Sequence, residues 1–270
     1  MKKVLTIAGS DPTGGAGIQA DIKTMSAHGV YAMSVIVSVV AENTMRVISI
    51  EDISLKVIRD QIDAVYEDIG TDAVKIGMLS NSEIMVAVAQ KLREYSPLNI
   101  VLDPVMYAKG GNALMAENSI ETLIKELLPL CDLITPNIPE AEKITNMKIH
   151  SIEDMKRASE KILNYGCKSV LLKGGHYIGE AIDILYDGKD FVTYETKRIK
   201  TKNTHGTGCT LSSSIASNLA LGFSLKEAIS LSKEYITKAI EKDINIGKGH
   251  GPVNHFYNFF KEEKIYENIK

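Results

Sequence analysis

Several features that mark specialised proteins are scarce or missing from this chain. Its 270 residues include only three cysteines, Cys131, Cys167 and Cys209. They are widely spaced and form no CxxC pair or Cys/His cluster, so neither a disulfide framework nor a structural zinc site is indicated. The formal net charge of −3 provides no one-sided basic field for a phosphate backbone. We therefore expect no nucleic-acid partner.

Long apolar runs are missing as well. No stretch approaches the roughly 18 to 20 uninterrupted apolar residues that a membrane-spanning helix needs, so we expect no membrane partner. The amino-terminal sequence MKKVLTIAGSDPTGG reaches glycine and aspartate too early for the apolar region of a secretory signal. These two absences predict a cytoplasmic protein.

What remains is the composition of a globular protein, with 44% hydrophobic and 24% charged residues. That balance is enough to bury a large core. The sequence contains no repeat, linker or low-complexity stretch. We therefore expect one domain over residues 1–270.

Short apolar runs alternate with helix-period segments along the first two thirds of the chain. The runs that predict buried strands are Lys3 to Ala8, Met33 to Ala41, Asp72 to Gly77, Asn99 to Asp103, Asp132 to Asn137 and Ser169 to Lys173. The segments that predict helices, each at or just after a serine that can cap, are Leu55 to Ile69, Ser82 to Tyr95, Ser119 to Leu128 and Ser151 to Tyr165. This alternation predicts an α/β fold, with a mostly parallel sheet covered by helices on both faces.

The pattern changes after Lys173. The sequence AIDILYDGKDFVTYE has two strand-like runs joined through Asp187 and Gly188, a dipeptide that tolerates positive φ in a tight hairpin. This stretch predicts an antiparallel edge hairpin. Helix returns over residues 208–221 and 225–242, followed by the glycine- and histidine-rich GKGHGPVNHF.

The first strand is followed by the glycine-rich GSDPTGGAGIQAD. Residues 15–20 fit GxGxxA, and Glu42 lies about 20 residues further on, as in a dinucleotide fingerprint. A hydride-transfer enzyme is therefore one alternative, although the loop from Ala8 to Gly14 is long for the tight turn that holds a pyrophosphate. A structural turn into a helix is another.

The stretch NTHGTGCT, residues 203–210, carries the most distinctive chemistry. Gly206 and Gly208 let a ligand approach the backbone, and a helix starting near Gly208 directs its amides and positive dipole at an anion. Cys209 falls in the first turn of that helix, where the pKa of a thiol is lowered, so we expect a thiolate near neutral pH. It can attack covalently or accept a proton from a hydroxyl that receives a phosphoryl group. A Cys-His hydrolase using His205, and a merely buried cysteine, remain alternatives.

Charged residues stand at the ends of other predicted strands. Lys173 ends the sixth strand, Asp103 ends the fourth, and Glu140 follows TPN at a helix start. Ligands of open parallel sheets bind beyond the carboxyl ends of the strands, and phosphoryl transfer needs cationic groups and usually Mg²⁺. Since no GxxxxGK[ST] loop is present, a Walker-type ATPase is not indicated.

Taken in order, these motifs resemble a known family. The stretches AGSDPTGGAGIQADIKT, KIGML, LDPVM, TPNIPEAE, LLKGGH, TKNTHGTGCTLSSSIA and GKGHGPVNHF are similar to the hydroxymethylpyrimidine/phosphomethylpyrimidine kinases of thiamine biosynthesis, in the ribokinase-like superfamily. The resemblance spans nearly the whole chain. It implies an ATP- and Mg²⁺-dependent kinase that phosphorylates 4-amino-5-hydroxymethyl-2-methylpyrimidine and then its monophosphate, and it favours a homodimer.

The resemblance also implies site residues. Cys209 would be the base, with an anion hole formed by Gly206, Thr207 and Gly208. Lys173 would neutralise the transferring phosphate. Asp103 and Glu140 would organise Mg²⁺, and the nucleotide would contact Asp103, Asn137, Glu140 and Lys173. The pyrimidine pocket would be lined by Gly9, Asp11, Glu42 and Met78.

One position departs from the family pattern. Many members read AQNT where this chain reads AENT, which places Glu42 at the pyrimidine edge. A carboxylate accepts hydrogen bonds but donates none unless it is protonated. A pyridoxine/pyridoxal kinase of the same branch and a non-catalytic vitamer- or nucleotide-binding protein are therefore kept as alternative functions.

Overall fold

The computed structural model describes residues 1–108, 111, 113–175, 181–242 and 244–259. The final residue of the LLKGGH motif, His176, lies outside this part of the chain. No helix in the described ranges combines the length and the apolar character that crossing a membrane requires.

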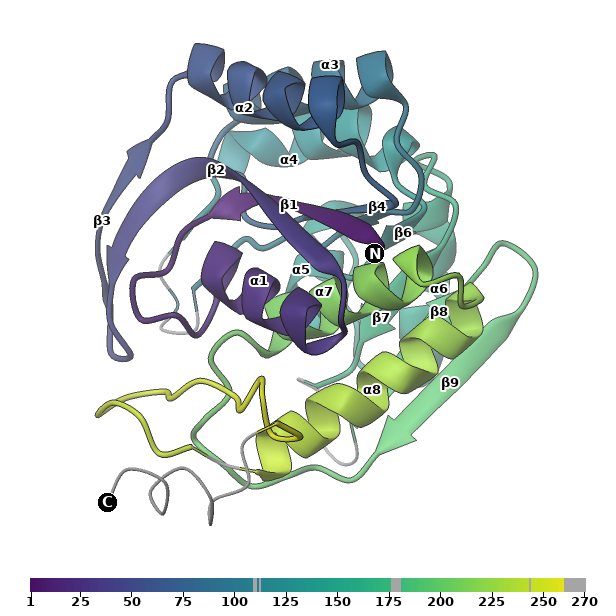
Figure 1. Ribbon diagram of the computed structural model, residues 1–270. Helices are drawn as coiled ribbons and strands as arrows, with labels where there is room; N and C mark the ends of the chain where they lie inside the picture. Colours follow the sequence, from purple (N-terminus) through teal and green to yellow (C-terminus); the bar gives the residue numbers. More distant parts are fainter. Residues whose placement is uncertain (109–110, 112, 176–180, 243, 260–270) are drawn as a thin grey trace, which may run out of the picture.

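One sheet organises the described residues (Figure 1). Its strands are β1 (Lys3–Gly9), β2 (Tyr31–Glu42), β3 (Val47–Asp52), β4 (Ala73–Ile76), β5 (Ile100–Leu102), β6 (Leu133–Ile134), β7 (Val170–Lys173), β8 (Ala181–Tyr186) and β9 (Phe191–Thr196). They lie side by side in the order β3-β2-β1-β4-β5-β6-β7-β8-β9. The six strands from β2 to β7 in this order pair in parallel, so the predicted parallel sheet is confirmed.

Both edges of the sheet are antiparallel. The predicted hairpin is confirmed as β8 and β9, with Gly188 at φ 87° in its turn. Strand β3, which pairs antiparallel with β2, was not predicted, although its sequence VISIED contains three β-branched apolar residues; this apolar run is short, and a short run does not settle the type of element. The reversal between β2 and β3 depends on Asn43, whose side-chain oxygen accepts the backbone N–H groups of Met45 and Arg46.

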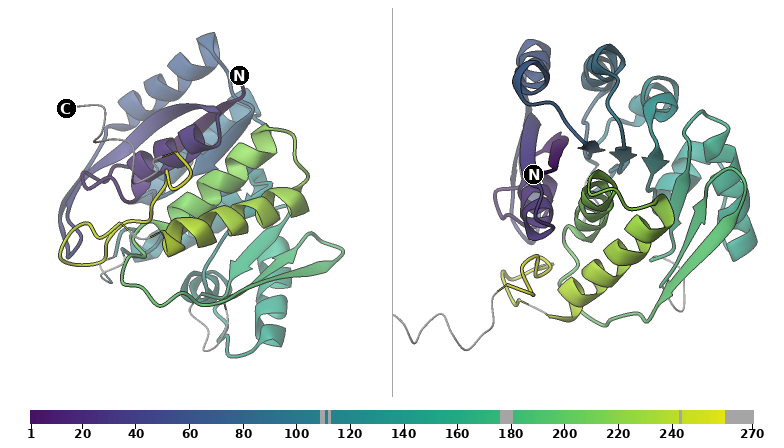
Figure 2. Two further views of the ribbon diagram at one scale, coloured as in Figure 1. Left: turned by 60° about the horizontal axis from the view of Figure 1, so that its bottom comes forward. Right: turned by 45° about the vertical axis from the view of Figure 1, so that its right-hand side comes forward.

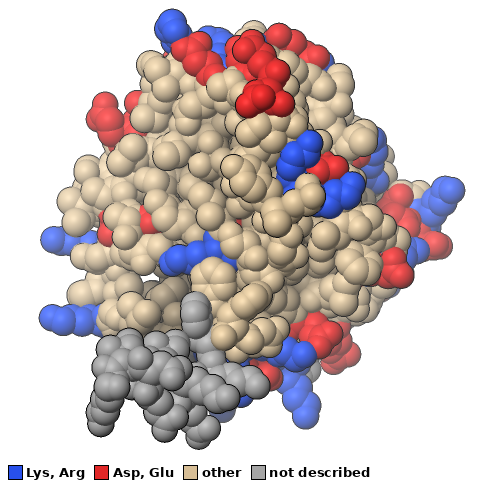
Figure 3. Space-filling model, viewed as in Figure 1, with Lys and Arg blue, Asp and Glu red and all other residues tan. Residues whose placement is uncertain are grey.

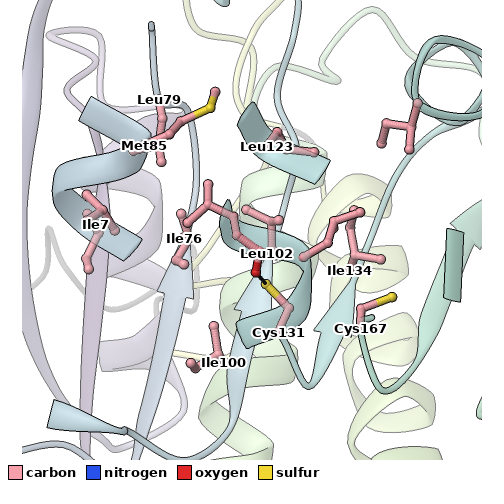
Figure 4. Close-up of a cluster of buried hydrophobic side chains, with 14 of the residues drawn as sticks. Ile7, Ile76, Leu79, Met85, Ile100, Leu102, Leu123, Cys131, Ile134 and Cys167 are labelled. Carbon is pink, nitrogen blue, oxygen red and sulfur yellow. Dashed lines mark hydrogen bonds between the residues drawn. The ribbon is translucent and has the colours of Figure 1, made fainter. Parts of the chain in front are cut away.

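Helices cover both faces of the sheet, as predicted. One face carries α2 (Leu55–Asp68), α3 (Ser82–Tyr95), α4 (Ile120–Thr122), α5 (Ile138–Thr145) and α6 (Ile152–Leu163), and the other carries α1 (Gly17–Ala27), α7 (Thr207–Ala220) and α8 (Leu225–Glu241). Figure 2 shows the two helical layers on opposite sides of the strands. In Figure 4, apolar side chains of the parallel strands pack with Met85 and Leu123.

Local sequence explains most helix starts. Ser54 and Ser151 cap α2 and α6 as predicted, whereas Asn81 rather than Ser82 caps α3. The predicted helix from Ser119 to Leu128 is wrong as a regular element, because α4 is only a short α-helical piece within an irregular run of 3₁₀ and π turns. The last 3₁₀ turn of that run, Leu128–Leu130, contains Pro129, which supplies no amide hydrogen for a regular α-helix.

Charge is mixed over the surface. On the face seen in Figure 3, acidic and basic side chains lie at several separate places, and much of the area between them is uncharged.

The core predicts a contrast between two isoleucines. Ile7 in β1 is fully buried, whereas Ile48 in β3 is 62% exposed. We expect Ile7→Ala to lower the free energy of unfolding by about 2–5 kcal/mol, because it removes buried methyl groups and leaves a cavity. The matched Ile48→Ala should change it by less than about 0.5 kcal/mol. Urea denaturation measures both, and equal losses would contradict the packing described here.

Candidate active site

A cavity of about 700 Å³ opens at the carboxyl ends of the parallel strands. Eleven of the twelve predicted site residues line it; they are Gly9, Glu42, Met78, Asp103, Asn137, Glu140, Lys173, Gly206, Thr207, Gly208 and Cys209. The topology therefore brings residues from β1, β2, β5, β7, α5 and α7 to one place. None of the described residues after Lys242 lines this cavity.

The start of α7 forms one wall. Gly206, at φ 73°, precedes the helix, and the first intrahelical bond runs from the Thr210 amide to the Gly206 carbonyl (2.8 Å). A Cβ atom on Gly208 would lie 3.2 Å from Asp103 Oδ2 and 3.4 Å from Lys173 Nζ. Glycine at this position therefore lets the positive end of the helix dipole approach the charged pair closely.

Lys173 and Asp103 form that charged pair. Lys173 Nζ lies 2.8 Å from Asp103 Oδ1; the Asp103 side chain is almost fully buried and the Lys173 side chain is 14% exposed. Although burial disfavours the charged amine, the carboxylates of Asp103 and Glu140 raise the pKa of Lys173. Lys173 is therefore a fixed cation at the edge of the sheet.

Glu140 adds a second carboxylate beside this pair. It belongs to a capping box at the start of α5. The backbone N–H of Asn137 donates to Glu140 Oε2 (2.8 Å), and the backbone N–H of Glu140 donates to Asn137 Oδ1 (2.9 Å). Burial and the charge of Asp103 raise the pKa of Glu140 to about 7, against the opposing effect of Lys173. Two carboxylates, Asp103 and Glu140, thus act on the one ammonium of Lys173.

Gly9, Met78 and Glu42 form the opposite wall. A Cβ atom on Gly9 would lie 2.7 Å from Met78 Sδ, so the backbone and the thioether are in direct contact. Burial and the nearby charge of Asp11 raise the pKa of Glu42 to about 7, while His205 opposes this rise. Glu42 can therefore carry a proton near neutral pH, and in that form it both donates and accepts hydrogen bonds.

Asp11 does not lie where it was expected. Its side chain is fully buried and is absent from the cavity wall. Its carboxylate accepts the backbone N–H groups of Thr13, Gly15 and Ala16 and lies 2.8 Å from His205 Nε2. Burial opposes ionisation, but the bonds from His205 and Thr13 prevail and lower the pKa of Asp11 to about 2. Asp11 therefore organises the glycine loop, and both of its carboxylate oxygens are engaged by groups of the protein.

The same contacts weigh against two alternative functions. The amides of Gly15 and Ala16, which would bind the pyrophosphate in a dinucleotide fingerprint, are already occupied by Asp11. His205 bonds to Asp11 rather than to Cys209, so the Cys-His pair of a hydrolase is not formed. Asp11, Glu42 and His205 place ligand-type atoms within 4.8 Å of one another, but the hydrogen bonds to Asp11 already explain this cluster.

The expectation of a lowered thiol pKa at Cys209 is wrong. Burial raises the pKa of Cys209 to about 11, and the neighbouring carboxylates Asp21 and Asp103 add to the rise. Lys75 and the Gly17 amide oppose it. The loss of water around the sulfur outweighs the favourable helix terminus. The thiol nevertheless lines the cavity, as predicted.

Two supporting features were missed. Lys75 is completely buried in β4 and lines the cavity; its only signal was a lysine inside the apolar run DAVKIG. The segment GKGHGPVNHF is hydrogen-bonded to residues 203–206, which lead into α7. The backbone N–H of His205 donates to the Gly251 carbonyl (3.0 Å), and the backbone N–H of Gly251 donates to Asn203 Oδ1 (3.1 Å).

Comparison with known sequences identifies close relatives. The chain matches a family model described as phosphomethylpyrimidine kinase over residues 11–254. It is 45% identical over 256 residues to the hydroxymethylpyrimidine/phosphomethylpyrimidine kinase of Bacillus subtilis, and the match covers 94% of each protein. It is 49% identical over 253 residues to the thiamine biosynthesis bifunctional protein ThiED of Geobacter sulfurreducens. That match covers 93% of this chain but only 52% of the longer relative.

Solved structures agree with these sequence matches. A phosphomethylpyrimidine kinase from Clostridium difficile superposes with a TM-score of 0.81 at 52% identity, covering 89% of this chain and 100% of that chain. An ADP complex of a pyridoxal kinase from Bacillus subtilis superposes with a TM-score of 0.88 at 39% identity, covering 94% of this chain and 97% of that chain. The ribokinase-like fold expected from the sequence is therefore confirmed.

The contact between the two glycine loops predicts the effect of a single methyl group. A Cβ atom on Gly206 would lie 1.8 Å from the Gly15 carbonyl oxygen, whereas Gly70 has a similar positive φ and open space around it. Both alanine variants carry the cost of the left-handed conformation, about 1–2 kcal/mol. Gly206→Ala should lose a further 1–3 kcal/mol or so of unfolding free energy through the clash. Chemical denaturation compares the two, and equal stabilities would refute the close approach.

Proposed function

The chain belongs to the phosphomethylpyrimidine kinase family, and we propose that it transfers the γ-phosphoryl group of ATP to 4-amino-5-hydroxymethyl-2-methylpyrimidine and then to its monophosphate, in thiamine biosynthesis. The observation that carries this proposal is the convergence of Lys173, Asp103 and the first turn of α7 on one cavity. A buried ammonium beside a helix amino terminus suits the charge that develops on a transferring phosphoryl group.

Each group in the cavity has a role in this proposal. The amides of Gly206, Thr207 and Gly208 and the ammonium of Lys173 hold the negative oxygens of the migrating phosphoryl group. The thiolate of Cys209 accepts the hydroxyl proton of the substrate while the hydroxyl oxygen bonds to phosphorus and the bond from phosphorus to ADP breaks. Asn137 contacts the nucleotide from the start of α5. The ADP complex of the related pyridoxal kinase supports a nucleotide in this cavity.

The carboxylates of the site fit Mg²⁺. Asp103 and Glu140 are hard oxygen donors and both are buried. Burial, and then the charge of Asp103, raise the pKa of Glu140, and a bound divalent cation would favour its ionised form. We propose that these two residues hold the ion and its waters. When bound, Mg²⁺ neutralises negative charge on the phosphate oxygens.

The acceptor wall fits an aminopyrimidine. Gly9 and Met78 provide a flat, partly apolar surface, and Glu42 provides the polar edge. The pKa of Glu42 is about 7, so the side chain can be protonated near neutral pH. The protonated carboxyl donates a hydrogen bond to a ring nitrogen, as a glutamine amide would, and its other oxygen accepts a hydrogen bond from the ring amino group.

A pyridoxal kinase is the second candidate, because a pyridoxal kinase superposes on this chain over nearly its full length. Such an enzyme would use the same anion-binding wall for a different aromatic alcohol. With ATP and equal amounts of both substrates present, the ratio of phosphorylated pyrimidine to phosphorylated pyridoxal separates the two functions. A strong preference for pyridoxal would reject the pyrimidine as the physiological substrate.

Three broader expectations belong to the same proposal. We propose one catalytic domain over residues 1–270, a homodimer in solution and a cytoplasmic location. Sedimentation equilibrium tests the dimer, and limited proteolysis tests the single domain.

The role of Cys209 predicts a large loss of rate without a loss of nucleotide affinity. Cys209→Ala should lower kcat by about 10²-fold or more, because the hydroxyl proton loses its acceptor, while ATP binding measured by calorimetry stays close to wild type. Since the pKa of Cys209 is about 11 in the ligand-free protein, the thiolate fraction and kcat of the wild type should rise with pH between 7 and 9. An unchanged kcat in the variant would exclude this base. A wild-type protein that binds ATP and pyrimidine without turnover would favour a binding protein.

The raised pKa of Glu42 predicts how substrate affinity depends on pH. Because the proton is lost above pH 7 or so, the KM for the pyrimidine should rise above that pH, by up to about tenfold per unit. Glu42→Gln keeps its donor at every pH and should flatten the profile. The control is Glu51→Gln on the exposed strand β3, which should leave the profile unchanged. A pH-dependent KM that persists in Glu42→Gln would rule out Glu42 as its origin.

A further inference from the structure

A buried ion pair between Lys75 and Asp21 lies beneath the cavity. Lys75 sits in the middle of β4, and its Nζ lies 2.9 Å from Asp21 Oδ1 and 2.8 Å from Asp21 Oδ2. Both side chains have no exposed surface. Lysine is almost never fully buried unless it is paired, and a buried ion pair is often no more stabilising than apolar side chains of the same size. Fold stability alone therefore gives little reason for this pair.

Asp21 is held from two further sides. Thr6 Oγ1 donates to its Oδ2 (2.6 Å), and Ser213 Oγ donates to its Oδ1 (2.7 Å). The pair is thus bonded to β1 and α7 as well as to α1 and β4. These contacts fix both the position of the carboxylate and, through it, the direction of the lysine side chain.

The bond to Ser213 connects the pair to the proposed base. Ser213 stands four residues after Cys209 in α7, so the two side chains project from the same face of the helix, one turn apart. Lys75 and Cys209 also line the same cavity. The ammonium points toward the cavity end of β4, since a Cβ atom on Gly77 would lie 2.7 Å from Lys75 Nζ.

The charges around the sulfur come from three elements. Asp21 from α1 and Asp103 after β5 disfavour a thiolate, whereas Lys75 from β4 favours it more than any other group does. The influence is mutual, because a negative sulfur raises the pKa of Lys75. Without this ammonium the two carboxylates would act on the sulfur with no cationic side chain among its main charged neighbours.

We propose that Lys75, held in place by Asp21, is a positioning residue that puts a positive charge beneath Cys209 and stabilises the thiolate form of that side chain. The consequence for catalysis rests on the proposed function, in which that thiolate accepts the hydroxyl proton. The electrostatic claim itself concerns the ligand-free protein and is testable without turnover.

The rate at which iodoacetamide alkylates Cys209, followed by peptide mass spectrometry from pH 7 to pH 10, reports the thiolate fraction. Lys75→Met should lower this rate by about tenfold or more at a given pH, equivalent to a shift of one unit or more in the thiol pKa. Asp21→Asn removes the opposing carboxylate, and it should raise the rate. A purely structural role predicts changes in the same direction for both variants, so opposite signs are the distinguishing result.

Control variants distinguish the effect of losing a charge from the effect of disturbing the folded structure. Lys91→Met removes a partly exposed, ion-paired lysine far along the chain and should leave the alkylation rate unchanged. Cys209→Ser confirms which peptide reacts. The double variant Lys75→Met with Asp21→Asn removes both charges and keeps the pocket neutral, and near-ultraviolet circular dichroism checks that each variant is folded.

Two outcomes overturn the proposal. One is a rate in folded Lys75→Met that equals the wild-type rate. The other is a rate in Asp21→Asn at or below the wild-type rate, which decides the matter even where Lys75→Met does not fold. Opposite shifts together with no ATP turnover by the wild type would instead defeat the proposed kinase function and leave the electrostatic role of Lys75 intact.

Discussion

The site depends on one close backbone contact, the joint between the glycine loop near the beginning of the chain and the loop before α7. The Gly206 backbone lies so close to the Gly15 carbonyl that no side chain fits between them, and His205 bonds to Asp11 across 194 residues of sequence. This joint fixes where α7 begins. The start of α7 in turn decides whether its amides and Cys209 face the Asp103–Lys173 pair. A loop displaced by one ångström would separate groups that act only at contact distance.

The second constraint is charge burial. Among the described residues, the lysine–aspartate pairs inside or beside the cavity include Lys173 with Asp103, Lys75 with Asp21 and Lys233 with Asp183. Burial raises the pKa of Glu140, Glu42 and Cys209, which stand outside these pairs. A cavity of this kind favours hydrogen-bonding and charged ligands, because they relieve the cost of holding charge away from water. The same physics explains why a helix terminus alone did not produce a thiolate.

The local sequence pattern predicted most regular strands and helices but not the irregular helical turns. The buried strands and the helix Ser82–Tyr95 follow directly from apolar periodicity. The edge strand β3 was not predicted because its apolar run is short and does not settle the type of element. The run after Ser119 was predicted as a regular helix because the periodicity of its apolar residues does not reveal where 3₁₀ and π turns replace the α-helix. Eleven of the twelve predicted site residues line the cavity, since parallel strands bring their carboxyl ends to one edge. Asp11 was misplaced because its own loop saturates its carboxylate.

The sequence by itself determined the alternation of strands and helices, the antiparallel hairpin at Gly188 and the set of reactive residues that follow each strand. These depend on neighbours within a few positions, which a linear pattern records. Only the tertiary structure decided the protonation of Cys209 and Glu42, the structural role of Asp11 and the place of Lys75 under the cavity. Each of these depends on burial and on charges contributed by distant segments, and the free energy of a buried charge is set by all of its surroundings at once.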